Sequence, residues 1–332
     1  MDTEPPFVRH SQILSFAKEK VNLDSEKRKT YRAQANNLRE SLEKYINDHA
    51  DYDHLRMYHS GSVEKGTALS TINDMDVAVY LKAAKEDVEE GDLLTWLRDR
   101  LIEAKPQNMD ASQILPIEAG AHCVTITYKG TGLDVDMVPV IYDGEPDGKG
   151  YLIPWGMDDR VLTSIPLHLA FIRKRKEEHP DHFAQVVRLV KWWAKLQKGA
   201  NQSFRFKSFM LELICAHLVD TGKMDVTDYP TALAQFFGYI LNSGLKERVI
   251  FADNYDADDV PDKTDVEIIG IFDPVNPDNN VASRYTEENR MLIVDEAQKA
   301  FDAITQAKYS ITKGEAAELW KRVFGHSFFI AI

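Results

Sequence analysis

Residues 59–81 read HSGSVEKGTALSTINDMDVAVYL, and this stretch decides how the rest of the chain is interpreted. Gly61 and Ser62 are typical of a turn, and Asp74 and Asp76 stand two positions apart at the head of an apolar run. In a β-strand, residues i and i+2 point to the same face of the sheet. The stretch therefore predicts a turn followed by a strand that carries two carboxylates on one face.

A third carboxylate is expected from residues 133–140, LDVDMVPV. Apolar residues alternate there with Asp134 and Asp136, so both acids occupy the face opposite the apolar one. Carboxylates held close together repel each other, and a divalent cation that prefers hard oxygen ligands, such as Mg²⁺, removes the repulsion. Backbone N–H groups and the hydroxyl of the Gly61-Ser62 turn suit a phosphate chain. The combination predicts metal-dependent nucleotidyl transfer, although each motif alone is also typical of an ordinary turn or a solvated strand end.

The composition is that of a globular protein. Of the 332 residues, 44% are hydrophobic and 28% are charged, which is typical of a folded chain with a core. No apolar run approaches the roughly 20 residues that span a bilayer, and the first residues do not resemble a signal peptide. Cys123 and Cys215 lie in apolar surroundings without metal-ligand spacing, which favours buried thiols in a reducing compartment. We therefore expect a cytoplasmic protein without membrane contact.

The formal net charge of −13 bears on the substrate. A protein that grips a long nucleic acid needs a broad basic surface, because phosphate neutralisation supplies most of the affinity. Basic residues cluster here only locally, as in residues 173–176, RKRK. The charge disfavours an enzyme that modifies tRNA and favours a small, metal-chelated substrate.

The first part of the chain mixes helix and strand patterns. A long amphipathic helix is expected over residues 24–48. Residues 122–128 and 133–142 have strand patterns and flank a glycine-rich turn at 129–132, which predicts a hairpin. This hairpin would bring the third carboxylate beside the first two.

A boundary is expected at residues 143–150, which contain three glycines and one proline. Beyond it, helical periodicity dominates at residues 165–178, 180–197, 208–220, 229–242 and 287–308, with strand patterns limited to 248–252 and 266–272. We expect an α+β protein with a sheet domain in 1–150, a mainly helical domain in 151–332, and the active site in the cleft between them.

The Gly-Ser turn, the Asp-x-Asp pair and the distant third Asp resemble the polymerase-beta-type nucleotidyltransferase superfamily. Within it, the chain is similar to the cyclic GMP–AMP synthase/DncV-like nucleotidyltransferases (CD-NTases), relatives of oligoadenylate synthetase. The further segments that carry this likeness are 188–193 (RLVKWW), 204–212 (FRFKSFMLE) and 273–281 (DPVNPDNNV). The likeness covers essentially the whole chain and is greatest to the bacterial clade C, or CdnC-type, enzymes. It implies a polymerase-beta-like core, with a mixed sheet flanked by helices, and a C-terminal helical domain like that of oligoadenylate synthetase.

The resemblance also implies residue roles. Asp74, Asp76 and Asp136 would be the catalytic acids and hold two Mg²⁺ ions, or Mn²⁺ in their place. Asp136 is preferred to its rival Asp134 because family members carry the ligand just before a hydrophobic-x-Pro segment. The residues that would bind the nucleotide are Gly61, Ser62, Lys191, Lys207, Ser208, Asp273 and Asn280. The last two lie in a loop rich in Pro and Asn, whose side chains would equally be expected to build turns.

The activity implied by the resemblance is the condensation of ATP, or of other NTPs, into a cyclic oligonucleotide. For clade C the favoured product is cyclic tri-AMP, a second messenger that switches on a downstream effector in the anti-phage systems called CBASS. The resemblance further implies a HORMA-domain regulator with a Trip13-like ATPase. DNA is a candidate for an additional activator.

Two alternatives remain at this point. One is nucleotidyl transfer onto a macromolecule, tRNA or protein, which the acidic net charge disfavours for tRNA. The other is a non-catalytic scaffold of the same fold. The presence of Gly61, Ser62 and all three acids argues against a scaffold, because drift would be expected to remove at least one of them.

Overall fold

The computed structural model describes residues 7–48, 52–83, 93–104, 114–142, 144, 146–152 and 160–330. The chain forms two compact units, one from Leu23–Phe171 and the other from Met1–Asn22 together with Ile172–Ile332. The expected division into residues 1–150 and 151–332 differs from these units at two places. The N-terminal segment, up to Asn22, belongs to the helical unit. The sheet unit continues past residue 150 and ends at Phe171.

The N-terminal segment joins the helical unit through helix packing. Helix α1 (His10–Phe16) packs on α8 (Tyr229–Ser243), and the π-helical turn η1 (Ala17–Val21) packs on α6 (Phe183–Ala200). Phe16 is fully buried in that unit. Sequence periodicity gives no information on which distant helix a short amphipathic segment will cover, and so this assignment needed the structure.

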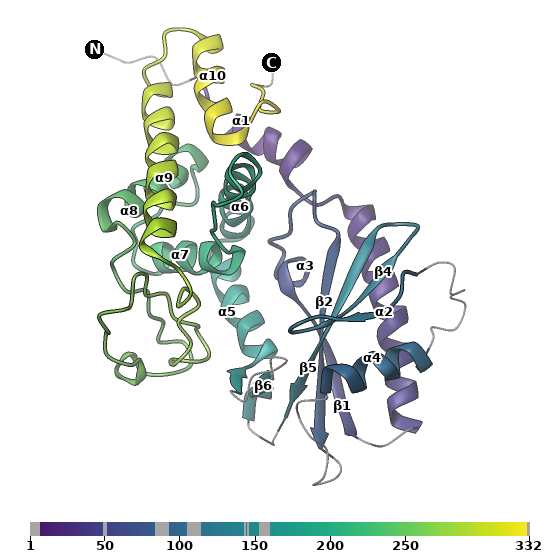
Figure 1. Cartoon of the computed structure of the whole chain (residues 1–332). Coiled ribbons are helices and arrows are strands. Elements are labelled where there is room, and N and C mark those ends of the chain that lie inside the picture. Colours follow the sequence, from purple (N-terminus) through teal and green to yellow (C-terminus); the bar gives the residue numbers. More distant parts are fainter. Residues whose placement is uncertain are drawn as a thin grey trace. The chain divides into compact units, whose positions relative to one another are not determined.

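The described strands of the Leu23–Phe171 unit form one seven-stranded mixed sheet (Figure 1). In chain order they are β1 (Tyr52–Ser60), β2 (Asp74–Ala83), β3 (Glu118–Ala119), β4 (Val124–Tyr128), β5 (Leu133–Ile141), β6 (Gly150–Leu152) and β7 (Val161–Thr163). Their spatial order is β1-β2-β5-β4-β3, with β6 paired to β5 and β7 to β6. β2 and β5 are parallel, and the other neighbours are antiparallel. The predicted hairpin is confirmed as β4–β5, and β6 with β7 carries the sheet unit beyond residue 150.

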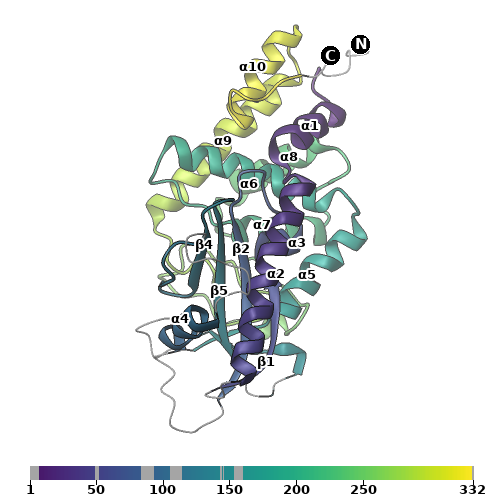
Figure 2. The same ribbon diagram turned by 90° about the vertical axis from the view of Figure 1, so that its right-hand side faces the viewer.

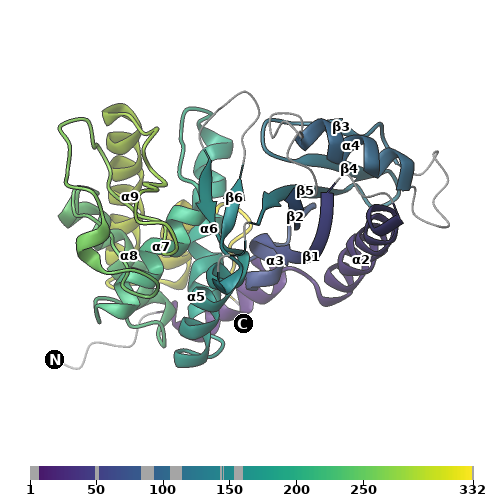
Figure 3. The ribbon, with the colours of Figure 1, turned by 90° about the horizontal axis from the view of Figure 1, so that it is seen from below.

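One face of this sheet is covered by helices. Figures 2 and 3 show α2 (Ser25–Asp48) and α4 (Leu93–Ala104) side by side on it. The buried side chains of β2 that point to these helices are Met75, Val77, Val79 and Leu81. The helix expected over residues 24–48 is confirmed, and Asp24 Oδ1 accepts the backbone N–H groups of Glu26 and Lys27, both at 2.9 Å. The sheet flanked by helices confirms the expected α+β fold. A short helix, α3 (Gly61–Lys65), connects β1 to the segment before β2.

The second unit is mainly helical, as expected. Besides α1, α6 and α8 it contains the end of α5 (Ile165–Glu178), α7 (Ser208–Asp220), the short turn η5 (Ala257–Asp259), α9 (Glu287–Ala307) and α10 (Lys313–Phe324). In Figure 1, α9 and α10 lie side by side at the yellow end of the chain. None of the helices in the described ranges combines the length and the hydropathy that a membrane crossing requires.

The strands predicted at 248–252 and 266–272 were wrong. Within the described residues these segments meet only in the isolated bridge Val249–Ile271. Val249 donates to the carbonyl of Gly270 and accepts from the N–H of Phe272, and within the described residues these two bonds are not continued on either side. The N–H of Ile271 points to the opposite edge of its segment, where the side-chain oxygen of Asn280 accepts it at 3.2 Å.

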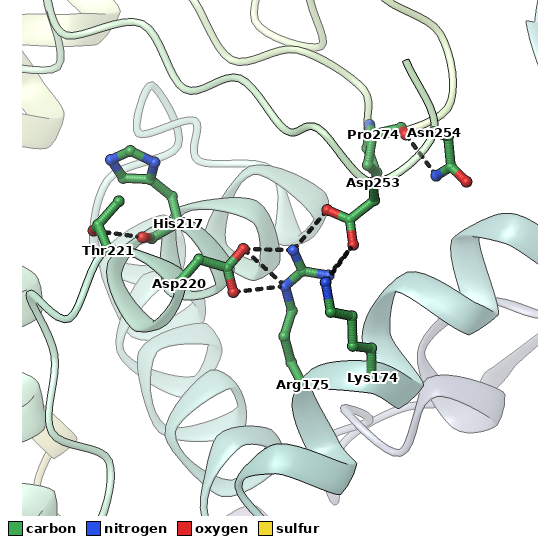
Figure 4. A network of polar contacts seen from close by, with 8 residues as sticks. All are labelled: Lys174, Arg175, His217, Asp220, Thr221, Asp253, Asn254 and Pro274. Carbon is green, nitrogen blue, oxygen red and sulfur yellow. Dashed lines mark hydrogen bonds and ion pairs between the residues drawn. The ribbon is translucent and has the colours of Figure 1, made fainter. Parts of the chain in front are cut away.

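A buried guanidinium joins three segments of the helical unit (Figure 4). Arg175 in α5 has a side chain only 1% exposed, and it donates to both oxygens of Asp220 at the end of α7 and of Asp253 in the loop beyond α8. A buried charge requires partners of this kind, because it loses its hydration on folding. Two carboxylates on one guanidinium therefore tie the loop at Asp253 to the helices.

Candidate active site

Four acidic side chains lie on one face of the sheet, where β2 and β5 begin. The two strands run parallel, with Asp74 in register with Asp134 and Asp76 in register with Asp136. Residues paired across neighbouring strands project to the same face, as do residues two apart in one strand. All four acids are half-buried, whereas Met75 is fully buried on the opposite face. The structure thus brings the three predicted catalytic acids together, along with the rival Asp134.

The Gly-Ser turn lies directly against one of these acids. Ser60 pairs with Asp76 in the β1–β2 ladder, and α3 begins at the next residue, Gly61. Gly61 has φ of +68°, and a Cβ atom built on it would lie 1.7 Å from Oδ2 of Asp76. Only glycine avoids both the left-handed strain and this collision. The two parts of the predicted motif therefore meet as the sequence indicated, with Ser62 half-buried in the first turn of α3.

The carboxylates on β5 have different hydrogen-bond partners. Asp136 Oδ1 accepts from the hydroxyl of Thr125 at 2.6 Å. Asp134 Oδ1 accepts from the hydroxyl of Thr127 at 2.5 Å, and its Oδ2 accepts from Asn73 Nδ2 at 3.3 Å. Both oxygens of Asp134 are therefore engaged by protein donors.

Sequence reasoning missed Asn73, Thr125 and Thr127. The available signal was the alternation in residues 124–128, VTITY, which places the two threonines on the face opposite the buried residues. Once the hairpin register is known, Thr125 stands opposite Asp136 and Thr127 opposite Asp134. The turn at 129–132 would have allowed that register to be predicted.

The thiol of Cys123 lies at the edge of the acidic group, with Sγ 3.8 Å from the hydroxyl of Thr125. Burial, followed by the charge of Asp136, raises the pKa of this thiol. A thiol that stays protonated is a poor metal ligand. Cys215 is fully buried, as expected, but Cys123 is half-buried, so the expectation of a buried thiol was wrong there.

The donor chemistry of the site fits a hard divalent cation. Carboxylate and hydroxyl oxygens gather on one face, and oxygen ligands suit Mg²⁺ or Mn²⁺ rather than zinc. As far as the described residues go, no three or more His, Cys, Asp or Glu side chains are yet arranged around a common point that could hold a metal ion. The β2–β5 register places the backbone of the acids side by side.

Lys191, predicted to bind the triphosphate, is buried in the helical unit. Its ammonium Nζ lies 3.2 Å from Oε1 of Glu212 in α7, and the two side chains are 5% and 3% exposed. A buried pair of this kind holds α6 against α7. The structure therefore gives Lys191 an ion-pair partner that the sequence did not indicate.

Lys207 and Ser208 are exposed at the start of α7, where Lys207 is the N-cap residue. Lys207 Nζ donates to the carbonyl oxygen of Val281 at 3.2 Å. Although the residue as a whole is exposed, its ammonium loses part of its hydration, and this loss, followed by the charges of Arg284 and Arg205, lowers the pKa of Lys207. Three cationic groups near the positive end of a helix dipole favour an anion. Arg205 and Arg284 were not predicted, although Arg205 stands two residues before Lys207 in the sequence.

Asp273 and Asn280 build their own loop. Asp273 is buried, its Oδ1 accepts from the backbone N–H of Val275, and its Oδ2 accepts from Asn279 Nδ2. Asn280 accepts from Ile271 and Ala282 and donates to the carbonyl of Ile269 at 2.8 Å. These bonds give both side chains the turn-building role that the composition of the loop allowed.

Comparison with known proteins gives relatives over the whole length. No protein-family model matches the chain. The chain is 47% identical over 328 residues to a cyclic AMP-AMP-AMP synthase of Escherichia coli strain MS 115-1, covering 99% of both proteins. It is 32% identical over 321 residues to the CBASS oligonucleotide cyclase CdnC of E. coli strain KTE188, covering 96% of this chain and 97% of that protein.

Solved structures agree with these relatives. The E. coli MS115-1 CdnC structures, one in complex with HORMA-deltaN and one with ATP, match with a TM-score of 0.87 and 47% identity, over 97% of this chain and 99% of theirs. The GTP-bound form of Vibrio cholerae DncV matches with a TM-score of 0.69 at 14% identity, over 98% of this chain and 96% of that one. At 14% identity, the match to DncV shows a shared fold.

Proposed function

The chain belongs to the CdnC-type oligonucleotide cyclases of CBASS, members of the CD-NTase family of nucleotidyltransferases, and on this premise we propose that it condenses ATP into cyclic tri-AMP. The product is taken from the 47%-identical relative, which is named a cyclic AMP-AMP-AMP synthase. In this proposal the cyclic product acts as a second messenger for a downstream effector, in the bacterial cytoplasm.

The observation that carries the proposal is the acidic face at the start of β2 and β5. Asp74 and Asp76 stand on one strand and Asp136 on its parallel neighbour, with the backbone of Gly61 against Asp76. These three acids would hold Mg²⁺, or Mn²⁺. Two such ions, when bound, lower the pKa of an attacking hydroxyl and neutralise the charge of a leaving pyrophosphate. The chain itself supplies the rigid register of the carboxylates and, at Gly61 and Ser62, N–H groups and a hydroxyl for phosphate oxygens.

The helical unit contributes a second set of nucleotide contacts in this proposal. Lys207 and Ser208 at the start of α7 offer a cation, a hydroxyl and backbone N–H groups to the triphosphate. Lys191 would add a contact only by sharing its ammonium with Glu212. Asp273 and Asn280 would act indirectly, by keeping their loop in shape.

Partners follow from the same relative. Its cyclase was solved in complex with a HORMA protein, and we extend that partner to this chain. A regulator activates an enzyme when it binds the competent state more tightly than the inactive one. A Trip13-like ATPase that resets the regulator, and DNA as an additional activator, complete the proposed system.

The test is incubation of the purified protein with Mg²⁺ and radiolabelled ATP, alone and with a HORMA-domain protein. We expect a small, phosphatase-resistant product that migrates with authentic cyclic tri-AMP. The matched control is the Asp74→Asn/Asp76→Asn variant, which removes two charges at nearly constant volume and should make no product. Label transferred to tRNA or protein would replace the cyclase by the macromolecular alternative, and absence of turnover with every partner would favour a scaffold.

A further inference from the structure

Strand β4 presents two hydroxyls to the two acids of β5. Thr125 stands in register with Asp136 and Thr127 with Asp134, and each hydroxyl donates to the Oδ1 atom of the acid opposite. We propose that Thr125 is a positioning residue that fixes the carboxylate of Asp136 for cation binding, whereas Thr127 and Asn73 hold Asp134 out of the ligand set. This inference rests on the proposed function, in which Asp136 is the third acid.

The hydrogen bond from Thr125 is suited to orient a carboxylate. At 2.6 Å it has the length of a charge-assisted O–H···O⁻ bond, which is about twice as strong as a neutral one. Threonine is stiff at χ1 because its Cβ is branched, so the strand backbone fixes where the hydroxyl lies. Groups that donate hydrogen bonds to a metal ligand orient that ligand and are needed for full metal affinity.

Asp134 is held differently, although it lies on the same face and strand. Its two oxygens accept from two side chains on two different segments, Thr127 in β4 and Asn73 just before β2. Each oxygen therefore has a lone pair committed to a donor, so a cation bound there would share the carboxylate with both Thr127 and Asn73. The hydrogen bonds therefore distinguish two aspartates that strand periodicity makes equivalent.

Replacement of the threonines by valine tests orientation without changing the packing much. Both side chains are half-buried on the acidic face, and the apolar core lies on the other face. Valine keeps the branched shape and the strand preference of threonine but lacks the hydroxyl. Thr127→Val is the matched control for Thr125→Val, because it makes the same change two residues away on the same strand.

The first readout is the dissociation constant of Mn²⁺, measured by electron paramagnetic resonance on the full-length protein with a non-hydrolysable ATP analogue. We expect Thr125→Val to weaken Mn²⁺ binding about 10- to 100-fold. Thr125→Ser, which restores a hydroxyl, should bind close to the wild-type value, and so should Thr127→Val, because Asn73 still holds Asp134. The Mg²⁺ concentration for half-maximal rate should rise in Thr125→Val by the same factor, with the KM for ATP at saturating Mg²⁺ little changed.

Wild-type Mn²⁺ affinity in Thr125→Val, or an equal loss in Thr127→Val, would overturn the inference. Failure of Thr125→Ser to restore binding would do the same, because the hydroxyl would then not be the relevant group. Thr125→Ala repeats the measurement if the valine variant melts well below wild type.

The Asp74→Asn/Asp76→Asn variant separates this inference from the proposed function. If that variant binds Mn²⁺ as tightly as wild type, the acids are not the metal site and both proposals fail. If it loses Mn²⁺ while Thr125→Val retains it, only the positioning role of Thr125 fails.

Discussion

Oδ2 of Asp76 occupies the position at which a side chain on Gly61 would begin. The distance from a Cβ atom on Gly61 to that oxygen would be 1.7 Å, and to Cγ of the same carboxylate 2.5 Å. The contact links the start of α3 to the acidic end of β2, two segments that are separate in the sequence motif. Any residue other than glycine must displace either the turn or the carboxylate.

Gly61→Ala should therefore abolish most of the activity. Misplacement of a reacting group by about 1 Å can cost roughly 100-fold in rate, and we expect a loss of at least that size in ATP consumption. Gly222→Ala is the control, since Gly222 has φ of +67° and a Cβ there meets no described atom within 4 Å. That variant should lose about 1 kcal/mol of stability and little activity. If Gly61→Ala were as active as Gly222→Ala, the turn or the carboxylate would accommodate the Cβ atom, and the contact with Asp76 would not be needed for activity.

Asp136→Asn should cost far more activity than Asp134→Asn. Loss of a proposed ligand affects the chemical step itself, whereas loss of a neighbouring acid should cost about 10- to 100-fold. Initial rates of cyclic product formation, compared at saturating Mg²⁺, give the ranking. The opposite ranking would assign the third acid to Asp134 and the supporting role to Asp136.

This pair shows where sequence reasoning on the site ends. The alternation in residues 133–140 placed both acids on one face, and the structure confirms it. The features that distinguish them are Thr125, Thr127 and Asn73, which come from other segments and act through a register set by the β4–β5 turn. Strand periodicity describes one strand at a time and contains no information about the neighbour.

The same limit applies to the fold. Local patterns predicted the long helix before the sheet and most helices of the second unit, because amphipathic periodicity and caps are encoded within each segment. The unit on which α1 and η1 pack could not be predicted, because this packing depends on α8 and α6, which lie more than a hundred residues away in the sequence. Likewise, segments 248–252 and 266–272 have residues typical of strands, but they meet only at the isolated bridge Val249–Ile271, and residue preference cannot specify how far two distant segments pair.

Asp253→Asn should destabilise the helical unit in a pH-dependent way. Burial by itself would raise the pKa of Asp253, but the hydrogen bonds and charges of Arg175 and Lys174 outweigh it and hold that pKa below its usual value. A depressed carboxylate pKa contributes stability above the unfolded-state pKa, and this contribution is lost as the pH falls through the folded-state value. At neutral pH we expect the variant to be less stable by about 1.5–3 kcal/mol, the range for hydrogen bonds to charged groups.

Urea denaturation at a series of pH values measures this effect. The difference in free energy of unfolding between wild type and Asp253→Asn should be constant near neutrality and shrink below about pH 4. A difference that stays constant through the acid range would show that the ion pair with Arg175 is not its source.

Lys191→Met should be strongly destabilising, because it leaves Glu212 buried without its cation. Removal of one partner of a buried pair costs about 3–5 kcal/mol, whereas replacement of both by apolar groups of similar volume is often neutral. The Lys191→Met/Glu212→Met variant should therefore recover most of the stability in a thermal melt.

This recovery of stability allows ATP binding by Lys191 to be measured separately from its effect on folding. If Lys191 also contacts the triphosphate, the double variant will fold but bind ATP weakly, while Glu212→Met alone will keep its affinity. If instead the double variant recovers both its stability and its affinity for ATP, the ion pair with Glu212 is the function of Lys191. Binding of the triphosphate would then depend on Lys207 and its neighbouring arginines.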